Sequence, residues 1–401
     1  MTQTILVSAF LRQSQQDPVN KTMATITIPL LSRKILLTPL FIENKSHYHF
    51  ITIHLLKGEI MRPTRLLACL GLSLSLAFPV AASAAEEVNL YSARIESLIK
   101  PILDRFTEQT GINVNLVTGN ADQLISRLKT EGRNSPADML ITTDAGRLHR
   151  AKEAGVVQPV SSDILAERIP EAYRDPDNQW FGLSLRARPI MYVEGEVDPA
   201  ELSTYEDLAD PKWQKQICIR SSSNIYNQSL VASLIEANGP EATESWAKGL
   251  VNNMARPPQG GDRDQIKAAA AGQCKLAVAN TYYLAGMMNS TDVSEQEAAS
   301  KIRVFWPNQA DRGTHVNVSG AAITKAAQNR DNAIKLLEFL TSDEAQHWYA
   351  EVNGEYPVVA DIESSELLQQ WGNFKADDLN MSVLGENNAD AVKLMDRAGW
   401  Q

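Results

Sequence analysis

Short apolar runs alternate with helical patterns along the chain from residue 88 onward, and this alternation constrains the fold more than any other feature. Residues 88–91, 114–117 and 138–143 read as buried strands, whereas 95–106 and 123–129 carry apolar residues at helical spacing. Parallel strands need a long crossover between them, and that crossover is usually a helix. The order strand–helix–strand–helix–strand therefore predicts a parallel, doubly wound α/β sheet.

An extended stretch at 180–192 interrupts the alternation, and a second α/β series follows it. The second series has strand patterns at 215–223 and 275–283, and another irregular crossing follows at 302–318. Two α/β lobes joined by extended crossings are typical of a hinged binding protein with a ligand cleft between its lobes. The lobes that we expect, each a mostly parallel sheet flanked by helices, comprise 85–188 with 305–350 and 189–304 with 351–401.

A secretory signal peptide is predicted at residues 61–84. Arg62 and Arg65 form a charged start, an apolar run follows, and the small residues at 81–84 form an A-x-A cleavage site. The apolar run is shorter than the roughly 20 residues that a membrane span needs, so we expect export to the periplasm. Residues 1–60 lie upstream of this signal and are interpreted as a disordered extension that results from a mistaken start codon. A genuine cytoplasmic extension is the alternative.

Composition and cysteine content exclude several functional classes. Apolar residues make up 44% of the chain and charged residues 21%, as in ordinary globular proteins, and the net charge of −10 argues against a nucleic-acid partner. The G-x-S-x-G and H-E-x-x-H motifs of hydrolases are absent from the sequence, so we expect no enzyme. In an exported protein, Cys218 and Cys274 are expected to form a disulfide, and two buried free thiols are the alternative.

Adjacent tyrosines follow one of the strand patterns of the second lobe. Tyr282 and Tyr283 come directly after the apolar run 275–279, at the carboxyl edge of the strand, where ligands bind in open α/β sheets. If both phenols ionise, they become hard anionic oxygen donors, which suit a hard trivalent cation. The alternative is that both rings pack inside the protein with their hydroxyl groups at the surface.

Most of the chain is similar in sequence to a known family. Seven segments together resemble periplasmic ferric-iron-binding proteins, the solute receptors of iron ABC transporters. These segments are YSAR at 91–94, ADMLITTDAGRL at 137–148, LSLRARPIMY at 183–192, RSSSNIYNQSL at 220–230, ANTYY at 279–283, RGTHVNVSG at 312–320 and GEYPV at 354–358. The resemblance covers 86–401 and implies a type II two-lobe periplasmic-binding-protein fold, an inner-membrane ABC permease as partner, and a monomer.

The resemblance also implies the residues that bind the metal. Carried over position by position, the iron-binding tyrosines of the family fall on Tyr192, Tyr282 and Tyr283. Many relatives place a histidine just after the opening Tyr-Ser-x-Arg, but this chain has Ile95 and Glu96 there. Isoleucine cannot bind a metal, and Glu96 can do so only if its helical turn faces the cleft. The resemblance, with this departure, therefore implies a tyrosine-only set of protein ligands for Fe(3+), completed by an anion such as (bi)carbonate or by water.

Two arginines are candidates to hold that anion, because a guanidinium binds a planar anion with two parallel hydrogen bonds. They are Arg94 and Arg186, and an ordinary ion pair on the surface of a lobe is the alternative for each.

Four other residues have weaker functional claims. We expect Asp144 to cap the helix that follows it and His315 to be structural. Tyr226 is a further candidate for the metal or the cleft, and Tyr356 is one for the cleft. The alternative function for the whole chain is a periplasmic receptor for an organic or phosphorylated anionic solute, which would share the fold without needing the tyrosines.

Overall fold

The computed structural model describes residues 23–27, 50–54 and 86–401. The first two segments are the strands β1 (Met23–Thr27) and β2 (Phe50–His54), which pair in parallel. Their sequences, MATIT and FITIH, are rich in β-branched residues that favour strands. The expectation that residues 1–60 are disordered throughout was therefore wrong for these two segments. The predicted signal peptide at 61–84 lies outside the described residues.

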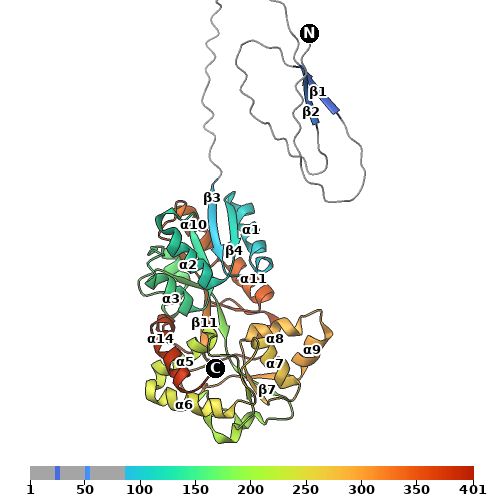
Figure 1. The fold of residues 1–401 in the computed structure, drawn as a ribbon, viewed down its shortest axis with the longest axis vertical. Helices are drawn as coiled ribbons and strands as arrows, with labels where there is room; N and C mark the ends of the chain where they lie inside the picture. The colour runs from blue at the N-terminus through green and yellow to red at the C-terminus, as the bar shows by residue number, and fades with distance from the viewer. Residues whose placement is uncertain (1–22, 28–49, 55–85) are drawn as a thin grey trace, which may run out of the picture. The chain divides into compact units, whose positions relative to one another are not determined.

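The first lobe is built on a mixed six-stranded sheet (Figure 1). In spatial order its strands are β12 (Tyr356–Pro357), β6 (Phe181–Ala187), β11 (Val316–Ile323), β5 (Met139–Thr143), β3 (Glu87–Ser92) and β4 (Asn113–Thr118). The strand β3 pairs in parallel with β4 and β5, as the alternation predicted. The pairs β12–β6, β6–β11 and β11–β5 are antiparallel. The strands β3, β4, β5 and β6 therefore run in one direction, as expected of a mostly parallel sheet, and the antiparallel pairs arise because β11 and β12 run the opposite way.

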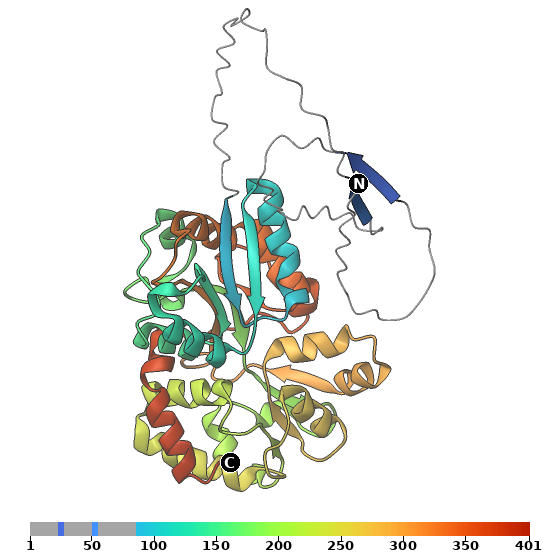
Figure 2. The ribbon, with the colours of Figure 1, turned by 45° about the horizontal axis from the view of Figure 1, so that its top comes forward.

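Helices with one apolar face cover this sheet. The helix α1 (Lys100–Thr110) has Pro101 in its first turn, buries Ile102, Leu103 and Phe106, and ends at Gly111, where φ is 76°. In Figure 2 it lies beside the neighbouring strands β3 and β4. The other helices of this lobe are α2 (Ala121–Glu131), α3 (Ala145–Glu153), α4 (Asp163–Arg168), α10 (Arg330–Phe339), α11 (Asp343–Asn353) and α13 (Ser382–Glu386).

The second lobe has a four-stranded sheet in the order β10 (Ile302–Phe305), β7 (Ile190–Val193), β9 (Leu276–Val278) and β8 (Ile217–Cys218). Alternate residues of its strands face two separate cores. One core contains helices α5 (Ile225–Asn238), α6 (Pro240–Asn253) and α14 (Asn388–Arg397). The other contains α7 (Asp262–Ala270), α8 (Thr281–Met288) and α9 (Val293–Ser300). Only β8 and β9 pair in parallel in this sheet.

The chain passes between the two sheets after Ala187 and again between Phe305 and Val316. The expected boundary at residue 351 was wrong, because β12 pairs with β6 of the first sheet, and Met381 and Leu384 belong to the first core. The final helix α14 packs against α5 and α6 of the second lobe, where Figure 1 shows it in red. Within the described part of the chain, every helix is too short or too polar to cross a membrane.

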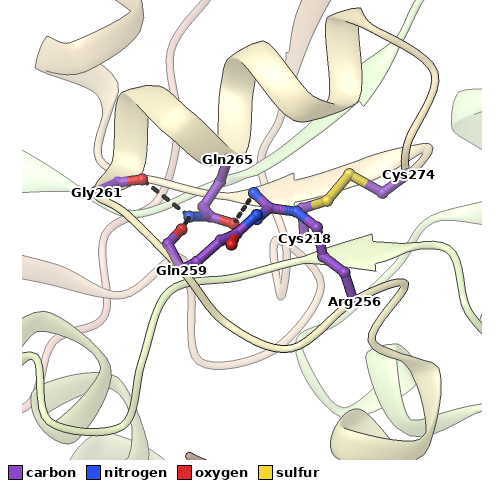
Figure 3. The surroundings of a disulfide bond; sticks show 6 residues. All are labelled: Cys218, Arg256, Gln259, Gly261, Gln265 and Cys274. Atoms are coloured by element: carbon purple, nitrogen blue, oxygen red, sulfur yellow. Dashed lines mark hydrogen bonds between the residues drawn. A yellow bond between two sulfur atoms is a disulfide. The ribbon is translucent and has the colours of Figure 1, made fainter.

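The predicted disulfide between Cys218 and Cys274 is present, and both residues are buried (Figure 3). It joins the end of β8 to the turn that leads into the neighbouring strand β9. Beside it, Gln265 accepts a 3.2 Å hydrogen bond from Arg256 and donates to the carbonyl oxygens of Gln259 and Gly261. The disulfide therefore holds together the two strands from which the candidate site is built.

Candidate metal centre

Three tyrosines meet at one edge of the second sheet. Tyr282 and Tyr283 lie in the first turn of α8, which follows β9, and Tyr226 lies in the first turn of α5, which follows β8. Because β8 and β9 are parallel, their carboxyl ends reach the same edge of the sheet. The ring centroids of Tyr282 and Tyr283 are 4.3 Å apart, and the phenol of Tyr282 lies close enough to Tyr226 to influence its pKa. Three phenol oxygens are thus available to one ligand.

The two helices begin differently, and the difference involves the phenols. At the start of α5, the side chain of Asn224 accepts a 3.0 Å hydrogen bond from the backbone N–H of Tyr226, as an N-cap does. Asn280 occupies the same position in α8, but its side chain caps no backbone N–H. Instead, its Nδ2 lies 3.4 Å from the hydroxyl oxygen of Tyr282, and its Oδ1 accepts a hydrogen bond from Arg188. The cap position of α8 therefore serves to orient a phenol.

Arg186 extends from β6 of the first lobe over the rings of Tyr226 and Tyr282, at 5.1 and 5.8 Å from their centroids. Its side chain is 1% exposed, and Nη2 donates a 3.0 Å hydrogen bond to the carbonyl oxygen of Val318. Nε and Nη1 have no hydrogen-bond partner among the described residues. A buried guanidinium with unpaired donors is a site for an anionic oxygen atom.

The three phenols differ in acidity. Burial disfavours the ionised form of Tyr226, but the charge of Arg186 and hydrogen bonds from Tyr282 and Thr143 outweigh this effect and lower its pKa. Burial, together with the charges of Tyr226 and Tyr283, raises the pKa of Tyr282. Burial and the charge of Tyr226 also raise the pKa of Tyr283. Tyr226 thus ionises more easily than a free phenol, whereas burial opposes the ionisation of Tyr282 and Tyr283.

The geometry does not bring Tyr192 to this cluster. The strand β7 runs antiparallel to β9, with Ile190 opposite Val278 and Tyr192 opposite Leu276. The amino end of β7 therefore lies at the edge that carries the phenols, and Tyr192 lies toward the other end of the sheet. Its ring packs against the core that contains α5 and α6.

The chain is similar in sequence and fold to known proteins. The family model described as bacterial extracellular solute-binding protein matches residues 102–376. The chain belongs to this family. This solute-binding protein is 51% identical over 316 residues to iron uptake protein A1 of Synechocystis sp., a match that covers 79% of this chain and 88% of the relative.

Two solved structures resemble the solute-binding protein over its described length. One is a Trichodesmium protein in complex with iron and citrate ligands, with 54% identity and a TM-score of 0.77; the match covers 79% of this chain and all of the other. The second is apo FutA2 from Synechocystis, with 48% identity, a TM-score of 0.76 and the same coverage. These matches confirm the expected two-lobe periplasmic-binding-protein fold.

Arg94 and Glu96 of the solute-binding protein lie in settings that differ from those expected for site residues. Arg94 forms a 2.9 Å ion pair with Glu355, in which the side chains are 5% and 4% exposed, and it also donates to Ser319. The ion-pair alternative therefore describes Arg94, although the pair is buried and not on the surface. Glu96 begins the short 3-10 helix η1 (Glu96–Leu98) and is exposed, as is Ile95 before it. No contact between Glu96 and the phenols is found in the described part of the chain.

The remaining predicted residues have structural contacts. Asp144 caps α3 as expected, accepting a 2.9 Å hydrogen bond from the backbone N–H of Gly146. His315 is buried, and both burial and the positive charges of Arg312 and Arg188 hold its pKa well below the usual range. Tyr356 lies in β12 and packs edge-on against Trp306.

Three residues near the phenols were not predicted from the sequence. Thr143 ends β5 and lies close enough to Tyr226 to lower its pKa, which places a residue of the first lobe beside the phenols of the second. Arg220 lies 5.6 Å from the ring centroid of Tyr226 and pairs with Asp262 at 3.4 Å. Arg188 is buried below the cluster. For Tyr226, which was a candidate already, the sequence carried a signal that it lies near Tyr282, because each of these tyrosines comes shortly after a strand pattern.

Proposed function

We propose that this protein binds ferric iron in the periplasm through the phenolate oxygens of Tyr226, Tyr282 and Tyr283. The observation that carries the proposal is the meeting of these three phenols at one sheet edge under the buried guanidinium of Arg186. The names of the relatives, which include iron uptake protein A1, support the same cargo. Tyr226 replaces Tyr192 in the proposed set, since Tyr192 lies away from the other two.

The chemistry of the donors suits Fe(3+). Three phenolates carry three negative charges, which balance a trivalent cation, and phenolate oxygen is a hard donor. Groups of three or more histidine, cysteine, aspartate or glutamate residues able to hold a metal are absent from the described ranges. The phenols are therefore the anionic donors that this site offers. Because free phenols titrate near pH 10, most of their protons are displaced only when the metal binds.

An anion completes the proposed coordination shell. Nε and Nη1 of Arg186 are buried without hydrogen-bond partners among the described residues, and the guanidinium lies over the rings of Tyr226 and Tyr282. A (bi)carbonate or another carboxylate-like anion can accept both hydrogen bonds and still offer an oxygen to the metal. The citrate in the Trichodesmium structure is an anion of this kind. We assign this role to Arg186 alone, because Glu355 occupies Arg94.

The protein would act as a receptor and not as a catalyst. Iron would bind first to the phenols of the second lobe, and Arg186 and Thr143 would then close the first lobe over it. The loaded monomer would deliver iron to an inner-membrane ABC permease. The alternative cargo, an organic or phosphorylated anionic solute, could use Arg186 but would leave three adjacent phenols without a role.

Absorbance titration of the mature chain with a ferric salt tests the proposal. Bound iron should produce a phenolate-to-iron charge-transfer band that saturates at one metal per protein. Tyr226→Phe, Tyr282→Phe and Tyr283→Phe each remove one donor and keep the ring, so each should weaken binding by orders of magnitude and reduce the band while the protein stays folded.

Tyr192→Phe is the matched control, because it deletes a phenol of the same lobe that lies outside the cluster. It should bind iron like the parent. If ferric salt produces no band, or if the three site variants bind iron as tightly as the parent, the iron assignment is wrong and the receptor for an anionic solute is favoured. If Tyr192→Phe alone loses the band, the ligand set proposed here is wrong although the cargo is right.

A further inference from the structure

Arg188 lies on the first crossing between the lobes and is 1% exposed. Its guanidinium contacts three separate segments of the second lobe. Nη1 donates to Asp262 Oδ2 at 2.8 Å and to Asn280 Oδ1 at 2.9 Å. Nη2 donates to Asn227 Oδ1 at 2.7 Å and to the carbonyl oxygen of Val278 at 3.2 Å. The planar fork of an arginine can hold four acceptors in fixed directions, which a lysine cannot do.

These acceptors adjoin the phenols. Asn280 receives a hydrogen bond from Arg188 and directs its own Nδ2 to the hydroxyl of Tyr282, so one side chain separates Arg188 from that phenol. Asn227 directly follows Tyr226 in α5, and its Nδ2 donates a 2.7 Å hydrogen bond to the carbonyl oxygen of Arg220. Arg188 thus contacts the helix starts of both α5 and α8.

The third acceptor links the same network to Tyr283. Asp262 is fully buried, and it accepts hydrogen bonds from Arg188, from the backbone N–H of Asn280 at 2.9 Å and from Arg220 at 3.4 Å. Arg220 in turn lies beside Tyr283 and 5.6 Å from the ring centroid of Tyr226. Each of the three phenols is therefore connected to Arg188 through one or two intervening side chains.

The backbone of Arg188 connects this network to both crossings. Its N–H donates a 3.1 Å hydrogen bond to the carbonyl oxygen of His315, which lies on the second crossing. Its carbonyl oxygen accepts a 2.8 Å hydrogen bond from the hydroxyl of Tyr205, and that hydroxyl also accepts from the N–H of His315. The residue that orders the phenol-bearing helices is thus itself held at the junction of the lobes.

We propose that Arg188 is a positioning residue that sets the mutual placement of the three phenols by holding the first turns of α5 and α8 to one guanidinium at the hinge. It touches neither the metal nor the anion. The proposal rests on the proposed iron site for its effect on binding, but the ordering of the two helix starts is a property of the protein without iron.

Arg188→Lys separates positioning from charge, because lysine keeps the positive charge beside Asp262 and cannot reach all four acceptors. Arg312→Lys is the matched control, since Arg312 is a largely buried arginine that pairs with Asp377 and contacts neither phenol-bearing helix. Two measurements are made on each full-length mature variant. Hydrogen–deuterium exchange of the iron-free protein reports the order of residues 224–229 and 280–285, and the charge-transfer band per bound iron reports the arrangement of the phenolates.

For Arg188→Lys we expect faster exchange in both segments, a shifted or weaker band per bound iron, and iron affinity lower by about 10- to 100-fold, as for other residues that orient metal ligands. Arg312→Lys should keep the exchange of both segments and the band of the parent. The proposal is overturned if Arg188→Lys also keeps them, even when its stability falls, because Arg188 would then only support the fold.

Asn227→Ala is a milder variant for the case in which Arg188→Lys does not fold. It removes the contact between Arg188 and α5 and leaves those with Asp262 and Asn280, so only residues 224–229 should exchange faster. Unchanged exchange there contradicts the proposal. If the parent shows no iron band, the proposed function fails, but the exchange measurements still decide whether Arg188 orders both helix starts.

Discussion

Asp144 of the first lobe accepts a 2.7 Å hydrogen bond from the hydroxyl of Ser229 in α5 of the second lobe, and both side chains are fully buried. The same carboxylate accepts a 2.9 Å hydrogen bond from Asn317 in β11 and caps α3. Thr143, the residue before Asp144, lies beside Tyr226. Asp144, which joins the two lobes, and Thr143, which lies beside a proposed metal ligand, are therefore adjacent in the chain.

Ser229→Ala should shift the protein toward an open arrangement. The substitution removes a donor from a buried carboxylate that bridges the lobes, and such a loss costs about 1–3 kcal/mol. Small-angle scattering should show that iron reduces the radius of gyration of the parent, and reduces that of Ser229→Ala by less. Iron release to a chelator should be faster in the variant. The prediction is wrong if iron reduces the radius of gyration of Ser229→Ala as much as that of the parent and only the free energy of unfolding is lower. The contact would then lie in a part of the interface that does not move.

Iron affinity should fall as the pH falls. Burial raises the pKa of Tyr282 and Tyr283, so both carry protons in the iron-free protein at neutral pH and must release them when the metal binds. Arg186 lowers the pKa of Tyr226 against the effect of burial, so this phenol should contribute least to the pH dependence. Competition with a chelator at several pH values, with a pH indicator to count released protons, measures the slope. Affinity that does not change with pH would show that phenols are not the ligands.

Glu355→Gln should destabilise the protein at neutral pH by about 3–5 kcal/mol, because Arg94 would remain buried without its counter-charge. Burial opposes ionisation of Glu355, but Arg94 and Arg186 outweigh it and hold its pKa below the ordinary value of 4.5. This carboxylate therefore contributes stability above about pH 4.5, and that contribution disappears as the pH falls through the lower folded-state pKa.

Urea denaturation at neutral and acidic pH measures both effects of Glu355→Gln. The loss of stability on acidification should be smaller in the variant than in the parent. Glu344→Gln is the control, since Glu344 pairs with Arg105 on the surface and should change stability by less than about 1 kcal/mol. Equal effects of the two substitutions would refute the buried role of Glu355.

Replacing the disulfide should lower stability by about 4 kcal/mol, the value that chain entropy gives for cysteines 56 residues apart. Urea denaturation of the double variant Cys218→Ser and Cys274→Ser, with the reduced parent for comparison, checks this value. Thiol titration of the unfolded, unreduced parent should find no free thiol. Finding two thiols would show that the bond does not form in the exported protein.

Local patterns were sufficient for much of the fold. The alternation of strands and helices in 88–143 corresponds to β3, α1, β4, α2 and β5, because each element buries one face whose period is visible in the residues themselves. The cap at Asp144 was also predictable, since an N-cap acts within its own turn. The antiparallel placement of β7 and β11 was not, because these strands follow crossings that carry no periodic pattern.

The candidate site, like the fold, was predictable from the sequence only in part. The sequence by itself determined that Tyr282 and Tyr283 follow a buried strand, and therefore that they reach the ligand-binding edge of a sheet. Only the tertiary structure decided that Tyr226 joins them and Tyr192 does not, because this depends on whether each strand runs parallel or antiparallel to β9. It likewise decided that Arg94 is neutralised by Glu355 while Arg186 keeps free donors. Packing decides which residues that are distant in sequence become neighbours. The sequence alone therefore does not show which buried arginine is paired with a carboxylate and which one keeps free donors.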